Sequence, residues 1–168
     1  MMTPAEAEQE IQRHLGATPR AEHSRFVGLA MRRVAESLGE DITVWELTGL
    51  CHDLDFHVTA GDRSRHGLVA AEWLAGRLPE AALQAIRAHD HRTGEVSNTP
   101  LGIALRMTDA LAVLRDDFGH ELPALLANPY ELRRRCVDRP WLPKLLLDGA
   151  EMLGMPAAKL GDIARATA

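Results

Sequence analysis

Three threonines, each followed directly by proline, mark where helices begin in this chain of 168 residues: Thr3, Thr18 and Thr99. Threonine accepts a hydrogen bond from the free N–H groups of a helix start, and proline suits the first helical position because its φ is already fixed. Glu6 completes a capping box with Thr3. Apolar residues recur at helical spacing after each pair, and no stretch alternates long enough to indicate a strand. We therefore predict an all-α protein.

The same periodicity gives approximate bounds for six helices, and glycine or proline marks most of the ends. The length suits a single domain with a core of its own. We expect two or three further helices after the sixth, interrupted by prolines, and these would pack on a core of residues 19–118 to complete one domain over residues 1–168. The six predicted helices cover residues 4–14, 19–38, 42–52, 64–78, 79–89 and 100–118.

Charge and composition exclude several classes of protein. The net charge of -5 disfavours a long nucleic acid as partner, since such proteins usually present a basic face. Nowhere is there an apolar run of membrane-spanning length. The two cysteines form no zinc pattern and no disulfide framework, and the acidic first residues lack the signature of a signal peptide. We expect a cytoplasmic protein.

Four histidines and two aspartates occur one after another in separate helical segments, mostly beside apolar neighbours. Burying an unpaired ionisable group is costly, and a divalent metal compensates several such groups at once. Taken singly, each has an ordinary alternative: a histidine within the core, a helix C-terminus, or an aspartate paired with a nearby arginine. One ligand from each helix of a bundle, however, can converge on one point. The six residues are His23, His52, Asp53, His66, His89 and Asp109.

This ordered pattern resembles the HD-domain superfamily of metal-dependent phosphohydrolases, which is defined by a histidine, a His-Asp doublet and a distant aspartate. The resemblance covers residues 19–114 and implies a single-domain helical bundle of the HD-domain type. His66 and His89 resemble the additional histidines of two-metal members. The doublet is His52-Asp53, and Met107-Thr-Asp-Ala110 resembles the last motif.

The resemblance implies two metal sites that share Asp53. His23, His52, Asp53 and Asp109 would hold the first metal ion, and His66, His89 and a bridging Asp53 the second. Such a set of imidazoles and carboxylates suits a divalent transition metal, Fe, Mn, Co, Ni or Zn, better than Mg or Ca.

The activity implied is hydrolysis of a small phosphorylated substrate, a nucleotide or dinucleotide, by metal-activated water, with Asp53 as the catalytic carboxylate. Two alternatives stay open. Some members with a similar ligand set are di-iron oxygenases acting on a phosphonate or polyol, and a domain of this kind can also serve as a non-catalytic nucleotide sensor. A homodimer is compatible with the sequence.

The sequence departs from the family pattern directly after the doublet. Many members read His-Asp-x-Gly-Lys, whereas Asp55 and Phe56 occupy the last two places here. Positive charge for the substrate phosphate must then come from elsewhere, and Arg65 and Arg92 are the candidates. His91 is a candidate accessory ligand or substrate contact, with an exposed loop histidine as its alternative.

Overall fold

The computed structural model describes residues 1–166, and all regular structure in that range is helical. The all-α prediction is therefore confirmed. The chain divides into two compact units, residues 1–105 and residues 106–168, with the boundary inside one helix. The assignment of residues 1–168 to one domain stays a prediction.

The first unit contains most of the helices predicted from the sequence. Its elements are α1 (Pro4–His14), α2 (Pro19–Leu38), α3 (Ile42–Cys51), the 3₁₀ turn η1 (Arg63–Arg65), α4 (Leu68–Trp73), α5 (Glu80–Arg87), the 3₁₀ turn η2 (His91–Thr93) and the start of α6 (Pro100–Phe118).

The predicted starts and ends of the long helices are confirmed, but the expected capping hydrogen bond of Thr18 is not. Thr18 is the N-cap of α2, yet its hydroxyl donates to the carbonyl oxygen of Leu15 at 2.9 Å and caps no helical N–H. The backbone N–H of Glu6 donates to Thr3 Oγ1 at 3.3 Å and the N–H of Thr3 donates to Glu6 Oε2 at 2.6 Å, which closes the capping box of α1. Helix α2 ends at Gly39, whose φ of +74° stops the helix in the left-handed conformation. Helix α3 begins at Asp41, whose carboxylate caps Val44 N–H at 3.0 Å.

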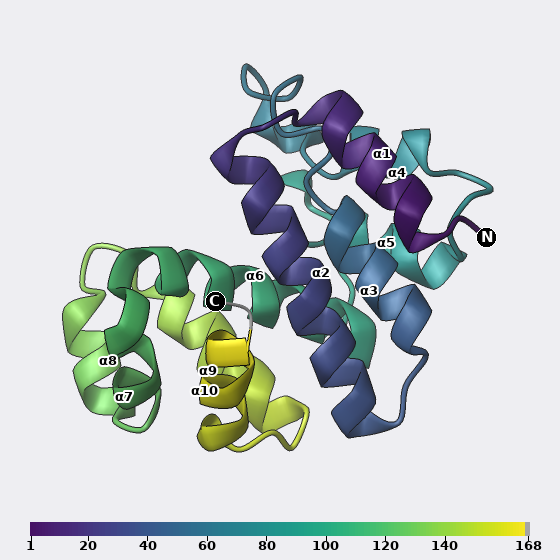
Figure 1. Ribbon diagram of the computed structural model, residues 1–168. Helices are drawn as coiled ribbons and strands as arrows, with labels where there is room; N and C mark the ends of the chain where they lie inside the picture. Colours follow the sequence, from purple (N-terminus) through teal and green to yellow (C-terminus); the bar gives the residue numbers. More distant parts are fainter. Residues whose placement is uncertain (167–168) are drawn as a thin grey trace. The chain divides into compact units, whose positions relative to one another are not determined.

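Helices α2 and α3 lie side by side and touch through two glycines (Figure 1). A Cβ atom built on Gly49 would lie 2.8 Å from the Cα of Gly28 and 2.8 Å from the carbonyl oxygen of Val27. These contacts are backbone atoms that cannot rotate away. The crossing therefore requires glycine at position 49, and it holds the C-terminal end of α3 against α2.

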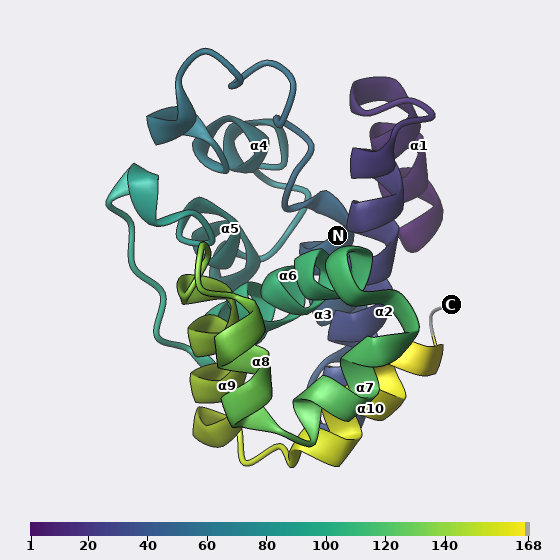
Figure 2. The same ribbon diagram turned by 90° about the vertical axis from the view of Figure 1, so that its left-hand side faces the viewer.

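The predicted helix over residues 64–78 is wrong as a continuous element. Gly67 has a φ of +87°, which an α-helix cannot pass, so the segment is divided into η1 and a short α4 (Figure 2). A Cβ on Gly67 would also lie 2.5 Å from the carbonyl oxygen of Ile86. Glycine is needed here for both reasons, and the break turns His66 out of helical geometry toward the interior of the first unit.

The second unit is built from short helices around leucines. Helix α7 packs against α10 (Figure 2). Leu122 and Leu126 of α7 and Leu160 of α10 are buried. Within residues 1–166, no helix combines the length and apolarity that crossing a bilayer would require. After α6 the elements are η3 (Gly119–Glu121), α7 (Leu122–Leu126), α8 (Pro129–Arg135), α9 (Trp141–Met152) and α10 (Ala157–Ala166).

We predict that Gly49→Ala lowers the free energy of unfolding by about 1–3 kcal/mol, because the added methyl group overpacks the α2–α3 crossing. Urea unfolding followed by circular dichroism measures the change. Gly61→Ala is the matched control, since a Cβ there meets nothing within 4 Å. Equal stability of the two variants would contradict the described crossing.

Candidate metal centre

The carboxylate of Asp53 lies at the centre of four histidines. Its Oδ2 atom is 3.3 Å from Nε2 of His52 and 3.7 Å from Nε2 of His23. Its Oδ1 atom is 3.0 Å from Nε2 of His66 and 3.5 Å from Nε2 of His89. All five side chains are buried. Each carboxylate oxygen thus faces its own pair of imidazoles.

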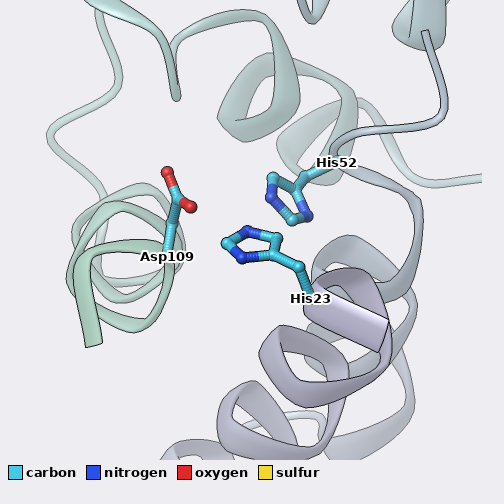
Figure 3. A group of neighbouring side chains, drawn as sticks. All are labelled: His23, His52 and Asp109. Carbon is cyan, nitrogen blue, oxygen red and sulfur yellow. The ribbon is translucent and has the colours of Figure 1, made fainter. Parts of the chain in front are cut away.

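The helix ends of the first unit bring these residues together. His52 is the C-cap of α3, and Asp53 is the next residue; His23 comes from the early part of α2. The α2–α3 crossing brings the rings of His23 and His52 to a centroid distance of 5.5 Å (Figure 3). His66 is the C-cap of η1, and His89 follows α5 by two residues.

Three of the histidines have the opposite ring nitrogen held by an acceptor. Nδ1–H of His52 donates to the carbonyl oxygen of Gly49 and Nδ1–H of His89 to that of Ile86, both at 2.7 Å. Nδ1 of His66 lies 2.8 Å from Oδ1 of Asp55. An acceptor at Nδ1 leaves the lone pair of a neutral imidazole on Nε2, the usual arrangement of histidines that bind metals.

The charges in this cluster shift the pKa values of two groups. Burial by itself raises the pKa of Asp53, but the electrostatic attraction of His52 and hydrogen bonds from His52, His66 and His89 outweigh it and hold that pKa well below its usual range. Burial lowers the pKa of His66, but hydrogen bonds to Asp53 and Asp55 raise it to about 9. Asp53 is therefore an anion at neutral pH.

The donor set fits a divalent transition metal. One ligand atom each from His52, Asp53 and His89 lies within 4.8 Å of the others. Nε2 of His66 and Nε2 of His89 are 3.3 Å apart, which is less than twice a metal–nitrogen bond of about 2.1 Å. Imidazole nitrogens with a shared carboxylate are ligands typical of Zn, Fe, Mn, Co or Ni.

Asp109, His91, Arg92 and Arg65 were also predicted from the sequence. Asp109 is half-buried in the middle of α6 and belongs to the second unit (Figure 3). His91 has a side chain that is 91% exposed. Arg92 donates from Nε to both carboxylate oxygens of Asp90, at 2.9 and 3.1 Å. Arg65 is exposed and lines a cavity of about 310 Å³.

The structure also places residues here whose roles the sequence reasoning missed. Arg20 donates from Nη1 to Oδ2 of Asp53 at 2.8 Å, and its guanidinium carbon lies 3.9 Å from the centre of the Phe56 ring. The guanidinium carbon of Arg63 lies 4.1 Å from the same ring centre. Arg20 precedes His23 by three residues, about one helical turn, and that spacing was the available signal.

Comparison with known proteins agrees with this geometry. The sequence model of the HD domain matches residues 20–138, which is more than half of the chain, so the protein belongs to the HD domain family. HD domains bind divalent metals and are generally metal-dependent phosphohydrolases. No curated protein and no solved structure matches the chain.

We predict that the stability of chelator-treated protein falls as pH rises from 6.5 to 9. The folded pKa of His66, about 9, exceeds its ordinary value of 6.5. The contribution of His66 to the free energy of unfolding is therefore complete below pH 6.5 and is lost as pH rises through 9. The loss is on the order of 3 kcal/mol. Urea unfolding at several pH values in EDTA measures the effect. His66→Gln should remove this slope; an unchanged slope would contradict the ion pairs of His66.

Proposed function

We propose that the protein is a metal-dependent phosphohydrolase that cleaves a small phosphoester, a nucleotide or dinucleotide. The observation that carries the proposal is the position of Asp53 between two pairs of histidines, with one carboxylate oxygen directed to each pair. A carboxylate in this place can bridge two cations. Membership of the HD domain family supports the reaction class.

Two divalent cations would be held on the two sides of Asp53. We assign His23 and His52 to the Oδ2 side and His66 and His89 to the Oδ1 side. Asp109 is proposed as a further ligand on the side of His23 and His52, on the strength of the family motif and its half-buried place in α6. Bound there, such cations supply Lewis acidity and lower the pKa of coordinated water toward neutrality.

The protein's own groups would orient the reactants. Asp53 stays ionised because of the surrounding imidazoles, so it can accept a hydrogen bond from the attacking water and orient it. Burial of Asp53 and its histidines keeps bulk water away and strengthens each electrostatic interaction.

We assign the binding of the substrate phosphate to Arg20 and Arg63, which both stack on Phe56. The ring restricts the two long side chains, so less conformational entropy is lost when they bind an anion. Arg20 already contacts Asp53, so its positive charge would lie near the phosphorus atom of a substrate bound at this centre. A guanidinium group can contact two phosphate oxygens at once. Phe56 occupies the position at which many family members have lysine. Its ring would compensate for the missing lysine by holding the guanidinium groups of Arg20 and Arg63.

We predict that His52→Ala lowers the bound metal and reduces kcat/KM by at least about 100-fold, because it removes a direct ligand. The measurements are elemental analysis and phosphate release from a panel of nucleotides and dinucleotides with added Mn²⁺. His120→Ala is the control, because this exposed histidine lies in the second unit.

Three outcomes would contradict the proposal. Equal losses in both variants would indicate damage to the fold rather than ligation. Tight nucleotide binding by metal-loaded protein without any phosphate release would favour the sensor alternative. Oxygen uptake by the iron-loaded protein with a phosphonate or polyol would assign it to the oxygenases.

We further predict that Arg63→Ala raises KM for the best phosphoester by about 10-fold and leaves the metal content unchanged, since the side chain of Arg63 contacts Phe56. The backbone carbonyl of Arg63, which accepts the N–H of His66 at 3.2 Å, is retained in the variant. Arg65→Ala and Arg92→Ala test the residues predicted from the sequence. A larger rise in KM for either of these than for Arg63→Ala would overturn the assignment to the arginines on Phe56.

A further inference from the structure

Asp55 is buried beside the proposed metal centre without facing it. Its Oδ2 atom accepts the backbone N–H of Gly67 at 2.7 Å and that of Ala70 at 3.0 Å, while its Oδ1 atom lies 2.8 Å from Nδ1 of His66. Its side chain has no exposed surface. Both carboxylate oxygens are therefore used inside the fold, and Asp55 is a support for the segment that carries His66.

The two carboxylate oxygens of Asp55 have different partners, and this difference determines which ring nitrogen of His66 carries the proton. Both groups at Oδ2 are backbone N–H donors, so the side-chain atom at this position must be a hydrogen-bond acceptor. Asp55 thus acts as the acceptor in this network, and Nδ1 of His66 is the donor in the Asp55–His66 contact. In a neutral ring the lone pair is then on Nε2, which faces Asp53 Oδ1 at 3.0 Å and His89 Nε2 at 3.3 Å.

His66 differs in this respect from two of its neighbours. Nδ1 of His52 and Nδ1 of His89 are held by the backbone carbonyls of Gly49 and Ile86. A backbone carbonyl persists when side chains change. The tautomer of His66, in contrast, depends on side chains that can be replaced. Oδ1 of Asp55 is the nearer, at 2.8 Å from Nδ1 of His66. The Thr59 hydroxyl lies at 3.4 Å from the same nitrogen and donates its own proton to the carbonyl oxygen of Asp55.

We infer that Asp55 is a positioning residue that keeps the proton of His66 on Nδ1 and so makes Nε2 available to the cation on the Oδ1 side of Asp53. The inference rests on the proposed function, in which His66 and His89 hold that cation. Asp55 touches neither substrate nor cation. It acts through the imidazole, and it accounts for an aspartate where many family members have glycine.

Asp55→Asn tests this with the smallest change of shape. The N–H groups of Gly67 and Ala70 still require an acceptor, so the amide oxygen takes the place of Oδ2. The NH₂ group then takes the place of Oδ1 and donates to Nδ1 of His66. The ring proton moves to Nε2, where it can donate to Oδ1 of Asp53. Each of the three hydrogen bonds that Asp55 makes keeps a donor and an acceptor, so the variant is expected to fold.

The expected result is loss of one metal ion and retention of the other. Elemental analysis and calorimetric titration with Zn²⁺ should give two ions per wild-type chain and one per Asp55→Asn chain, with the second binding step weakened by about 10- to 100-fold. Asp62→Asn is the matched control, because Asp62 is an exposed aspartate that caps η1, and asparagine caps equally well. The Asp62→Asn variant should bind two ions, like the wild type.

Long-range ¹H–¹⁵N NMR of the histidine rings gives a second readout that does not depend on activity. In Zn²⁺-loaded wild type the His66 ring should carry its proton on Nδ1, and in Asp55→Asn it should carry it on Nε2. If the variant fails to fold, the wild-type spectrum still decides, since a proton on Nε2 of His66 would overturn the inference.

The outcomes separate this inference from the proposed function. Two ions bound by Asp55→Asn, or a His66 proton that remains on Nδ1 in the variant, would overturn the role of Asp55 alone. Fewer than two ions bound by the wild type would overturn the two-cation proposal, and the NMR assignment would then show separately whether Asp55 fixes the tautomer.

Discussion

One buried carboxylate organises the centre of the first unit. Asp53 presents one oxygen to His23 and His52 and the other to His66 and His89. An isolated carboxylate in such a place would be strongly destabilising, and the surrounding imidazoles outweigh that cost, as the lowered pKa of Asp53 indicates. The helices around this group are arranged so that their ends, rather than their middles, supply most of its neighbours.

Close backbone packing makes this arrangement possible. The glycine contact between α2 and α3 lets the end of α3 approach α2, which brings His52 and Asp53 within reach of His23. Gly67 has the corresponding role on the other side, where its left-handed conformation ends one turn and starts α4 directly after His66. The glycines at these close backbone contacts thus determine where the ionisable side chains meet.

The sequence predicted the long helices well and singled out the four histidines that lie around Asp53, because both leave regular signals. Proline and glycine at caps mark the bounds of α2 and α6, and the ordered histidines indicate a shared centre. The prediction from the sequence failed at residues 64–78, where the spacing of apolar residues indicated one continuous helix. Gly67 breaks that helix for a tertiary reason, the approach of Ile86, which no local pattern carries.

The supporting residues of the centre were harder to predict for a similar reason. In the sequence Asp55 is visible only as a departure from the family pattern, and its three hydrogen bonds depend on how a loop returns to α4. The stacking of Arg20 and Arg63 on Phe56 joins segments about 40 residues apart in sequence. Contacts of this kind follow from the assembled fold and cannot be read from spacing.

X-ray diffraction from crystals grown with Mn²⁺, using the anomalous signal of the metal, tests the central claim most directly. The account predicts two anomalous peaks, one beside each carboxylate oxygen of Asp53, with His23 and His52 at the first and His66 and His89 at the second. Peaks remote from Asp53, or none in protein that retains its fold, would contradict it.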